Sequence, residues 1–95
     1  MFINVKKLNS KAKLPERATA TSAGADLCAC IDDDVVLMPG DRKLIPTGLA
    51  IAVPTGYGGF VFARSGLSSK FGVSLANCVG VIDSDYRGEV KISVI

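Results

Sequence analysis

A chain of 95 residues forms at most one small domain, and its composition, 48% hydrophobic and 21% charged, excludes a disordered chain. The net charge of +2 gives no nucleic-acid-binding signature, and the longest apolar runs, Val35–Met38 and Leu49–Val53, are too short to span a membrane. The absence of histidine excludes Ser-His-Asp and Cys-His catalysis and histidine metal sites. Any chemistry therefore depends on carboxylates, hydroxyls, backbone amides and a bound metal.

The N-terminal segment is basic, with five of the 11 basic residues and one acid, Glu16, in the first 17 positions: Lys6, Lys7, Lys11, Lys13 and Arg17. We expect a solvated segment, with a phosphate-facing or partner-facing arm as the alternative. No signal-peptide apolar region precedes the lysines. The three cysteines, Cys28, Cys30 and Cys78, are odd in number and poorly spaced for zinc. Reduced, partly buried thiols in the cytoplasm are the expectation.

Glycine and proline punctuate the chain about every ten residues, which is typical of an all-β sandwich, jelly roll or barrel. Leu49–Val53 predicts a strand covered on both sides, and Glu89–Val94 predicts a half-buried strand. The only helical candidate is a turn beginning at Ser65, whose hydroxyl is expected to cap it. Asp32–Asp34 predicts a turn rather than a cation site. The chain stops within a strand pattern, so we expect a domain incomplete at its C-terminus.

Three stretches carry candidate chemistry. Ala63–Lys70 combines a guanidinium, hydroxyls and a glycine at a helix start, which suits a phosphate as well as a capped surface turn. Asn77–Glu89 carries Asp83 directly after an apolar run, where loss of water would increase its basicity, and predicts a β-hairpin. Asp83 is thus either a general base or a turn former. Asp26 is expected to be a buried acid on a strand, where its carboxylate either accepts hydrogen bonds from backbone amides or acts on a bound metal.

Together these stretches resemble the first three motifs of the trimeric dUTPase family. The matching residues are Ala23-Gly24-Ala25-Asp26-Leu27, then Arg64-Ser65-Gly66-Leu67, then Asn77, Gly80-Val81-Ile82-Asp83-Ser84-Asp85-Tyr86-Arg87-Gly88. The resemblance implies a jelly-roll-like β-barrel of the β-clip type with one short helical turn. It also implies Mg²⁺-dependent hydrolysis of dUTP to dUMP and pyrophosphate in a homotrimer with sites between subunits. That reaction limits uracil in DNA and supplies dUMP for thymidylate synthesis.

The resemblance also implies residue roles. Asp83 would hold the 3′-hydroxyl and orient the attacking water, and Tyr86 would stack beneath the deoxyribose. Asp26 would act on Mg²⁺ through water. Uracil would be bound by Asn77 and by the backbone of Gly80, Val81 and Ile82. The phosphates would be bound by three residues of a neighbouring subunit: Arg64, Ser65 and Gly66. Lys91 would face the substrate.

Departures from the family pattern leave two alternatives. Ala63 and Ala25 stand where the family often has proline and an aromatic residue. A fourth motif and a glycine-rich arm that closes over the substrate have no counterpart before Ile95. The chain could therefore be a truncated, inactive nucleotide-binding domain. A dCTP deaminase is the other alternative, which Gly66 and the Asp85-Tyr86 pair disfavour.

Overall fold

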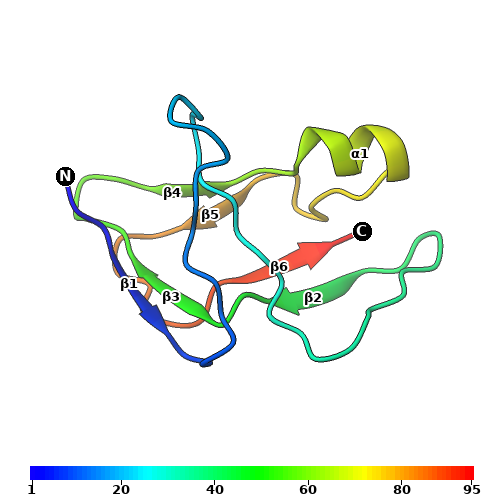
Figure 1. The fold of residues 1–95 in the computed structure, drawn as a ribbon, viewed down its shortest axis with the longest axis horizontal. Helices are drawn as coiled ribbons and strands as arrows, with labels where there is room; N and C mark the ends of the chain where they lie inside the picture. The colour runs from blue at the N-terminus through cyan, green and yellow to red at the C-terminus, as the bar shows by residue number, and fades with distance from the viewer.

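The computed structural model describes residues 1–95 as an all-β domain with one short helix, as the sequence predicted. In chain order the elements are β1 (Asn4–Lys7), β2 (Lys43–Pro46), β3 (Leu49–Ala52), β4 (Gly59–Val61), α1 (Ser65–Phe71), β5 (Gly80–Ile82) and β6 (Lys91–Val94). Figure 1 shows β4, β5 and α1 above two lower pairs of strands. The helix is seven residues long and lacks the length and apolar character needed to cross a bilayer.

All strand pairs are antiparallel, and they join segments that are distant in sequence. β1 pairs with β3, β2 with β6, and β4 with β5. Residues 74–76 lie beside the end of β6, with backbone bonds from Ala76 N to Ser93 O (2.8 Å) and between Ser74 and Ile95. The three pairs do not close a barrel within this chain.

The predicted hairpin between β5 and β6 is wrong. β5 pairs with β4 and β6 with β2, so residues 83–89, which we call the 83–89 loop, connect two different sheets. The Asp-Ser-Asp turn residues stop a strand but do not determine where the next strand pairs.

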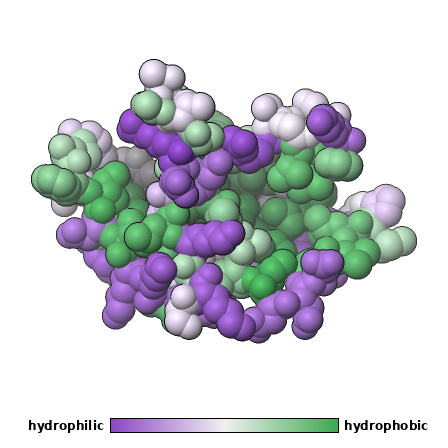
Figure 2. Space-filling view, viewed as in Figure 1, coloured by the Kyte–Doolittle hydropathy of each residue, from purple (hydrophilic) through white to green (hydrophobic).

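The core is small. Val53, Ile82 and Val90 form its buried cluster, and only eight of the 95 residues are buried. The accessible surface is 6992 Å², against about 5,200 Å² for a compact monomer of this mass. Large side chains such as Phe62 (67% exposed) and Phe71 (72%) lie at the surface, and Figure 2 shows hydrophobic residues spread over much of one face. The single chain therefore leaves apolar surface exposed, which further residues or another protein chain would cover.

The β2–β3 turn is anchored by a buried threonine. Thr47 is 1% exposed, and its hydroxyl donates a hydrogen bond to the Val90 carbonyl (2.6 Å) and accepts one from the Leu49 N–H (3.3 Å). The next residue, Gly48, donates its N–H to the Glu89 carboxylate (3.0 Å). This turn therefore holds the end of the 83–89 loop against the core.

We expect Thr47→Val to lower the free energy of unfolding by about 1–3 kcal/mol, because it leaves the Val90 carbonyl without its hydroxyl donor. Urea unfolding followed by circular dichroism measures the loss. Thr47→Ser keeps the hydroxyl and is the control. A loss in Thr47→Ser with none in Thr47→Val would show that the methyl group, and not the hydrogen bond, stabilises the turn.

Candidate functional site

Helix α1 begins at Ser65, as predicted, but Ser65 does not cap it. The N-cap residue is Arg64, in an extended conformation, and no side chain caps the first turn. The serine hydroxyl is therefore not used as a cap, and the prediction of a serine cap is wrong by one residue. A built Cβ on Gly66 meets no atom within 4 Å, so the backbone there is open to close approach.

An ion pair joins the first and second candidate stretches. Arg64 Nη1 lies 3.1 Å from Asp26 Oδ1, and backbone hydrogen bonds with Glu16 hold Asp26 in an isolated bridge. The Asp26 side chain is 38% exposed, so the prediction of a buried acid on a strand is wrong. The pair places a carboxylate and a guanidinium at one edge of a hollow.

This hollow has a volume of about 650 Å³ and is lined mainly by apolar side chains from residues 18–29, β4 and β6. Its polar members include Ser22, Asp26, Arg64 and Ser74. None of the candidate residues from Asn77 to Lys91 lines it. The Asp26–Arg64 pair is thus separate from the third candidate stretch within one chain.

The third stretch begins in a strained turn. Cys78 is the only residue other than glycine with a positive φ, at 65°, and the Val79 N–H donates to the Asn77 carbonyl (2.7 Å). Such strain is maintained only where the surrounding structure fixes it, and it is concentrated at functional sites. Asn77 lies exposed at this turn, directly before β5.

Strand β5 has one free edge. Its partner β4 occupies one side, and the two form a two-stranded sheet. Ile82 is buried, Gly80 is half-buried and Val81 is exposed. Backbone amides and carbonyls on the free edge are therefore able to bond another molecule.

The 83–89 loop is held by its own hydrogen bonds. The Asp83 carbonyl accepts the Tyr86 N–H (3.1 Å), and the Tyr86 hydroxyl donates to the Glu89 carbonyl (2.7 Å). The Arg87 guanidinium donates to the carbonyls of Ser84 (2.8 Å) and Tyr86 (3.0 Å). The Asp83 side chain is exposed although Ile82 is buried, so the expected loss of water around it does not occur in the single chain.

The two groups of candidate residues lie at opposite ends of the β4–β5 pair. β4 and β5 are antiparallel with Val61 opposite Gly80, so the chain leaves β4 toward α1 and leaves β5 in the other direction. Figure 1 shows α1 at one end and the 83–89 loop at the other. Arg64 and Asp83 are therefore not brought together, and exposed Lys91 begins β6 opposite Pro46.

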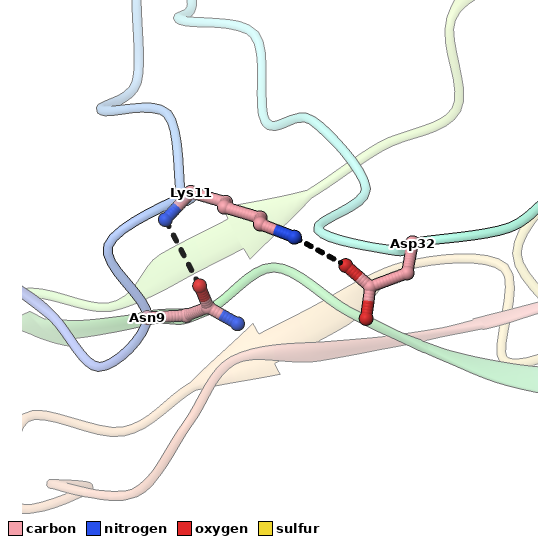
Figure 3. Close-up of polar contacts among 3 residues, drawn as sticks. All are labelled: Asn9, Lys11 and Asp32. Carbon is pink, nitrogen blue, oxygen red and sulfur yellow. Dashed lines mark hydrogen bonds and ion pairs between the residues drawn. The ribbon is translucent and has the colours of Figure 1, made fainter.

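The basic N-terminal segment uses one lysine internally. Lys11 Nζ lies 2.9 Å from Asp32 Oδ1, and the Lys11 N–H donates to Asn9 Oδ1 (2.9 Å), as Figure 3 shows. Asp32 thus has a cationic partner, and the described residues contain no group of three or more acidic, cysteine or histidine side chains arranged for a metal. The segment reaches the Asp26–Arg64 pair only through the backbone of Glu16, since none of its basic side chains forms an ion pair with Asp26.

We expect Lys11→Ala to lower the free energy of unfolding by at most about 1 kcal/mol, since the side chains of Lys11 and Asp32 are 74% and 77% exposed. Urea unfolding at low and at high salt measures this effect, which should shrink as salt screens the pair. A loss that stays large in high salt would contradict an exposed ion pair.

Comparison with known proteins decides the family. The sequence model described as dUTPase matches residues 10–95, which include every candidate residue. The chain belongs to the dUTPase family. A curated deoxyuridine 5′-triphosphate nucleotidohydrolase of Desulfitobacterium hafniense (strain DSM 10664 / DCB-2) is 60% identical over 84 residues, covering 87% of the chain and 56% of the relative. The chain thus spans less than two thirds of this relative's length.

Solved dUTPases share the fold. Staphylococcus bacteriophage 80alpha dUTPase with dUpNHpp has a TM-score of 0.88 and 36% identity, covering 98% of this chain and 53% of that one. A dUTPase variant from phage phi11 of S. aureus, described with a structural Mg(II) ion, has a TM-score of 0.89 and 35% identity, covering 99% and 59%. These matches confirm the predicted jelly-roll-like dUTPase fold.

Two features of this dUTPase-family site were missed from the sequence. The Asp26–Arg64 pair joins residues 38 positions apart, and no local pattern indicates such a contact. The positive φ of Cys78 was also missed, because asparagine, which signals that conformation, precedes this position rather than occupying it. Cys28 and Cys78 are exposed and Cys30 is half-buried, so the expectation of partly buried thiols is wrong for Cys28 and Cys78.

Proposed function

We propose that this chain forms the binding and catalytic part of a Mg²⁺-dependent dUTP nucleotidohydrolase that yields dUMP and pyrophosphate. The observation that carries this proposal is the dUTPase family match over residues 10–95, which contains all three motifs in order. The reaction needs no histidine, since a carboxylate and a metal suffice to activate water on a phosphate chain. The three free thiols suit a reducing cytoplasm.

The nucleoside end of the proposed site is built from β5 and the 83–89 loop. Uracil is read by Asn77 and by the backbone of Gly80, Val81 and Ile82, for which the free edge of β5 supplies donors and acceptors. Tyr86 stacks against the deoxyribose and leaves no room for a 2′-hydroxyl. Asp83 accepts a proton from the attacking water; its exposed carboxylate is open to both water and sugar.

The phosphate end is built around the Asp26–Arg64 pair and the start of α1. Arg64, Ser65 and Gly66 present a guanidinium, a hydroxyl and an open glycine backbone, which bind phosphate oxygens. Mg²⁺ commonly takes one or two carboxylates and completes its coordination with water and substrate phosphates, so the single carboxylate of Asp26 fits an ion held through water. When bound, the ion would offset phosphate charge. Lys91 adds a positive charge facing the substrate.

We further propose that the complete site lies between copies in a homotrimer. Arg64 and Asp83 lie at opposite ends of the β4–β5 pair, so a nucleotide held by Asp83 of one copy meets Arg64 of another. The excess of exposed apolar surface supports association of this kind. The part of the relatives that this chain does not span is proposed to include the closing arm, without which turnover is slow.

Pyrophosphate release from dUTP and Mg²⁺ tests the proposal. Two proteins are compared: the chain itself and the extended chain, defined as residues 1–95 joined to the part of the D. hafniense relative that follows the matched stretch. The extended chain should release pyrophosphate and no ammonia from dUTP, and should not deaminate dCTP. Deamination of dCTP without pyrophosphate would contradict the proposal, and equal rates for the two proteins would contradict the need for the arm.

A further inference from the structure

Gly88 lies where the Tyr86 side chain folds back over its own loop. A Cβ built on Gly88 would lie 2.7 Å from the Tyr86 hydroxyl oxygen, 2.9 Å from Cζ and 3.3 Å from Cε1. Contacts under 3.0 Å are essentially never made by real Cβ atoms, so the ring and any side chain at position 88 exclude one another. The space taken by the tyrosine ring is available only because residue 88 is glycine.

The backbone gives no other reason for glycine at this position. The glycines with a positive φ in this chain are Gly40, Gly48, Gly56 and Gly72, and Gly88 is not among them. Any residue could therefore adopt the backbone conformation of Gly88. The requirement comes from the tyrosine ring alone.

The ring is also fixed at its far end. The Tyr86 hydroxyl donates to the Glu89 carbonyl (2.7 Å), and the Glu89 carboxylate accepts the Gly48 N–H (3.0 Å). Gly48 follows the buried Thr47, whose hydroxyl bonds the Val90 carbonyl. The phenol is thus tied through Glu89 to the best-buried turn of the domain.

From these contacts we infer that Gly88 is a positioning residue that sets the place of the Tyr86 ring and, through it, the rejection of ribonucleotides. The inference rests on the proposed function, in which Tyr86 faces the sugar. A methyl group at position 88 pushes the ring away from the loop and breaks its bond to Glu89. The displaced ring no longer blocks the space of a 2′-hydroxyl.

The geometric part is tested by NMR on the 95-residue chain. The Gly88 α-hydrogen that a Cβ would replace faces the tyrosine ring, so it should resonate upfield of a glycine in an unstructured chain. Tyr86→Ala should remove this shift. A Gly88 resonance at its ordinary position in the unchanged chain would overturn the inference.

The functional part is tested by the preference for dUTP over UTP in pyrophosphate release, measured for the chain and the extended chain. Gly88→Ala should reduce this preference by roughly tenfold to a hundredfold, and Tyr86→Ala should reduce it by a similar factor. In a Tyr86→Ala background, Gly88→Ala should have no further effect. Asp85→Ala is the control, since Asp85 lies exposed in the same loop without a side-chain hydrogen bond. The preference of this variant for dUTP over UTP should equal that of the unchanged protein.

Two outcomes are distinguishable. An unchanged preference in Gly88→Ala beside a lost preference in Tyr86→Ala would overturn the inference and leave the proposed function intact. An unchanged preference in Tyr86→Ala would overturn the proposed role of the ring and the inference with it.

Discussion

Asp83→Asn in the extended chain is expected to reduce pyrophosphate release from dUTP by about 10²–10⁴-fold. Asparagine has the same shape as aspartate but takes no proton from water, so the chemical step is lost. Binding of dUpNHpp should persist, because the loop is held by the Asp83 carbonyl, Arg87 and Tyr86 rather than by the Asp83 carboxylate. The measurement is the rate of pyrophosphate release at saturating dUTP, with calorimetric titration of dUpNHpp.

Asp85→Asn is the matched control for this prediction. Asp85 lies two residues further along the same loop, is exposed, and has no side-chain hydrogen bond, so its loss removes a charge without removing the proposed base. Turnover in Asp85→Asn should stay close to that of the unchanged protein. If Asp83→Asn retained turnover as well, Asp83 would not be the base.

Gly48→Ala is expected to cost at least about 3 kcal/mol of unfolding free energy, a large share of the stability of a domain this small. Gly48 has a φ of 68°, and a built Cβ would lie 2.9 Å from the Cβ of Ala12 and 3.1 Å from the Sγ of Cys30. Backbone strain and a clash with buried atoms therefore act together. Denaturant unfolding followed by circular dichroism measures the loss.

Gly56→Ala separates the two causes. Gly56 has a similar φ of 89°, but a built Cβ there meets no atom within 4 Å. Its loss should be limited to the backbone term of about 1–2 kcal/mol. Equal losses of unfolding free energy at positions 48 and 56 would show that the turn at Gly48 accommodates the added methyl group, so that the close contacts add nothing to the backbone term.

The sequence predicted the strands in which the order of apolar and polar residues indicates which side chains are buried. Leu49 is fully buried and no residue of β3 is exposed, as the apolar pattern of this strand indicated. The alternation predicted over Glu89–Val94 was confirmed in part: Val90 is buried and Lys91 exposed, but Glu89 and Ser93 are half-buried, as Ile92 and Val94 are. Strand partners could not be predicted in the same way, because the pairing of β2 with β6 joins segments nearly 50 residues apart. The hairpin prediction failed for this reason.

The sequence predicted the family, but not the surroundings of the candidate residues. The three motifs identified the dUTPase family, which the comparisons confirm. The burial expected for Asp26 and Asp83 was wrong, because an apolar neighbour such as Ile82 buries its own side chain and not the next one along the strand. The contact between Asp26 and Arg64 depends on the tertiary fold and is visible only there. The assigned roles of these residues remain predictions.

The measurement that tests the account most directly is pyrophosphate release by mixed copies. Extended chains carrying Asp83→Asn and extended chains carrying Arg64→Ala are assayed separately and after refolding together in equal amounts. Each alone should be close to the buffer blank. If a site takes Asp83 from one copy and Arg64 from another, random mixing leaves about a quarter of the sites with both residues intact, and the mixture should regain that share of the activity of the unchanged extended chain. A mixture as inactive as its components, beside an active unchanged protein, would contradict a site shared between copies.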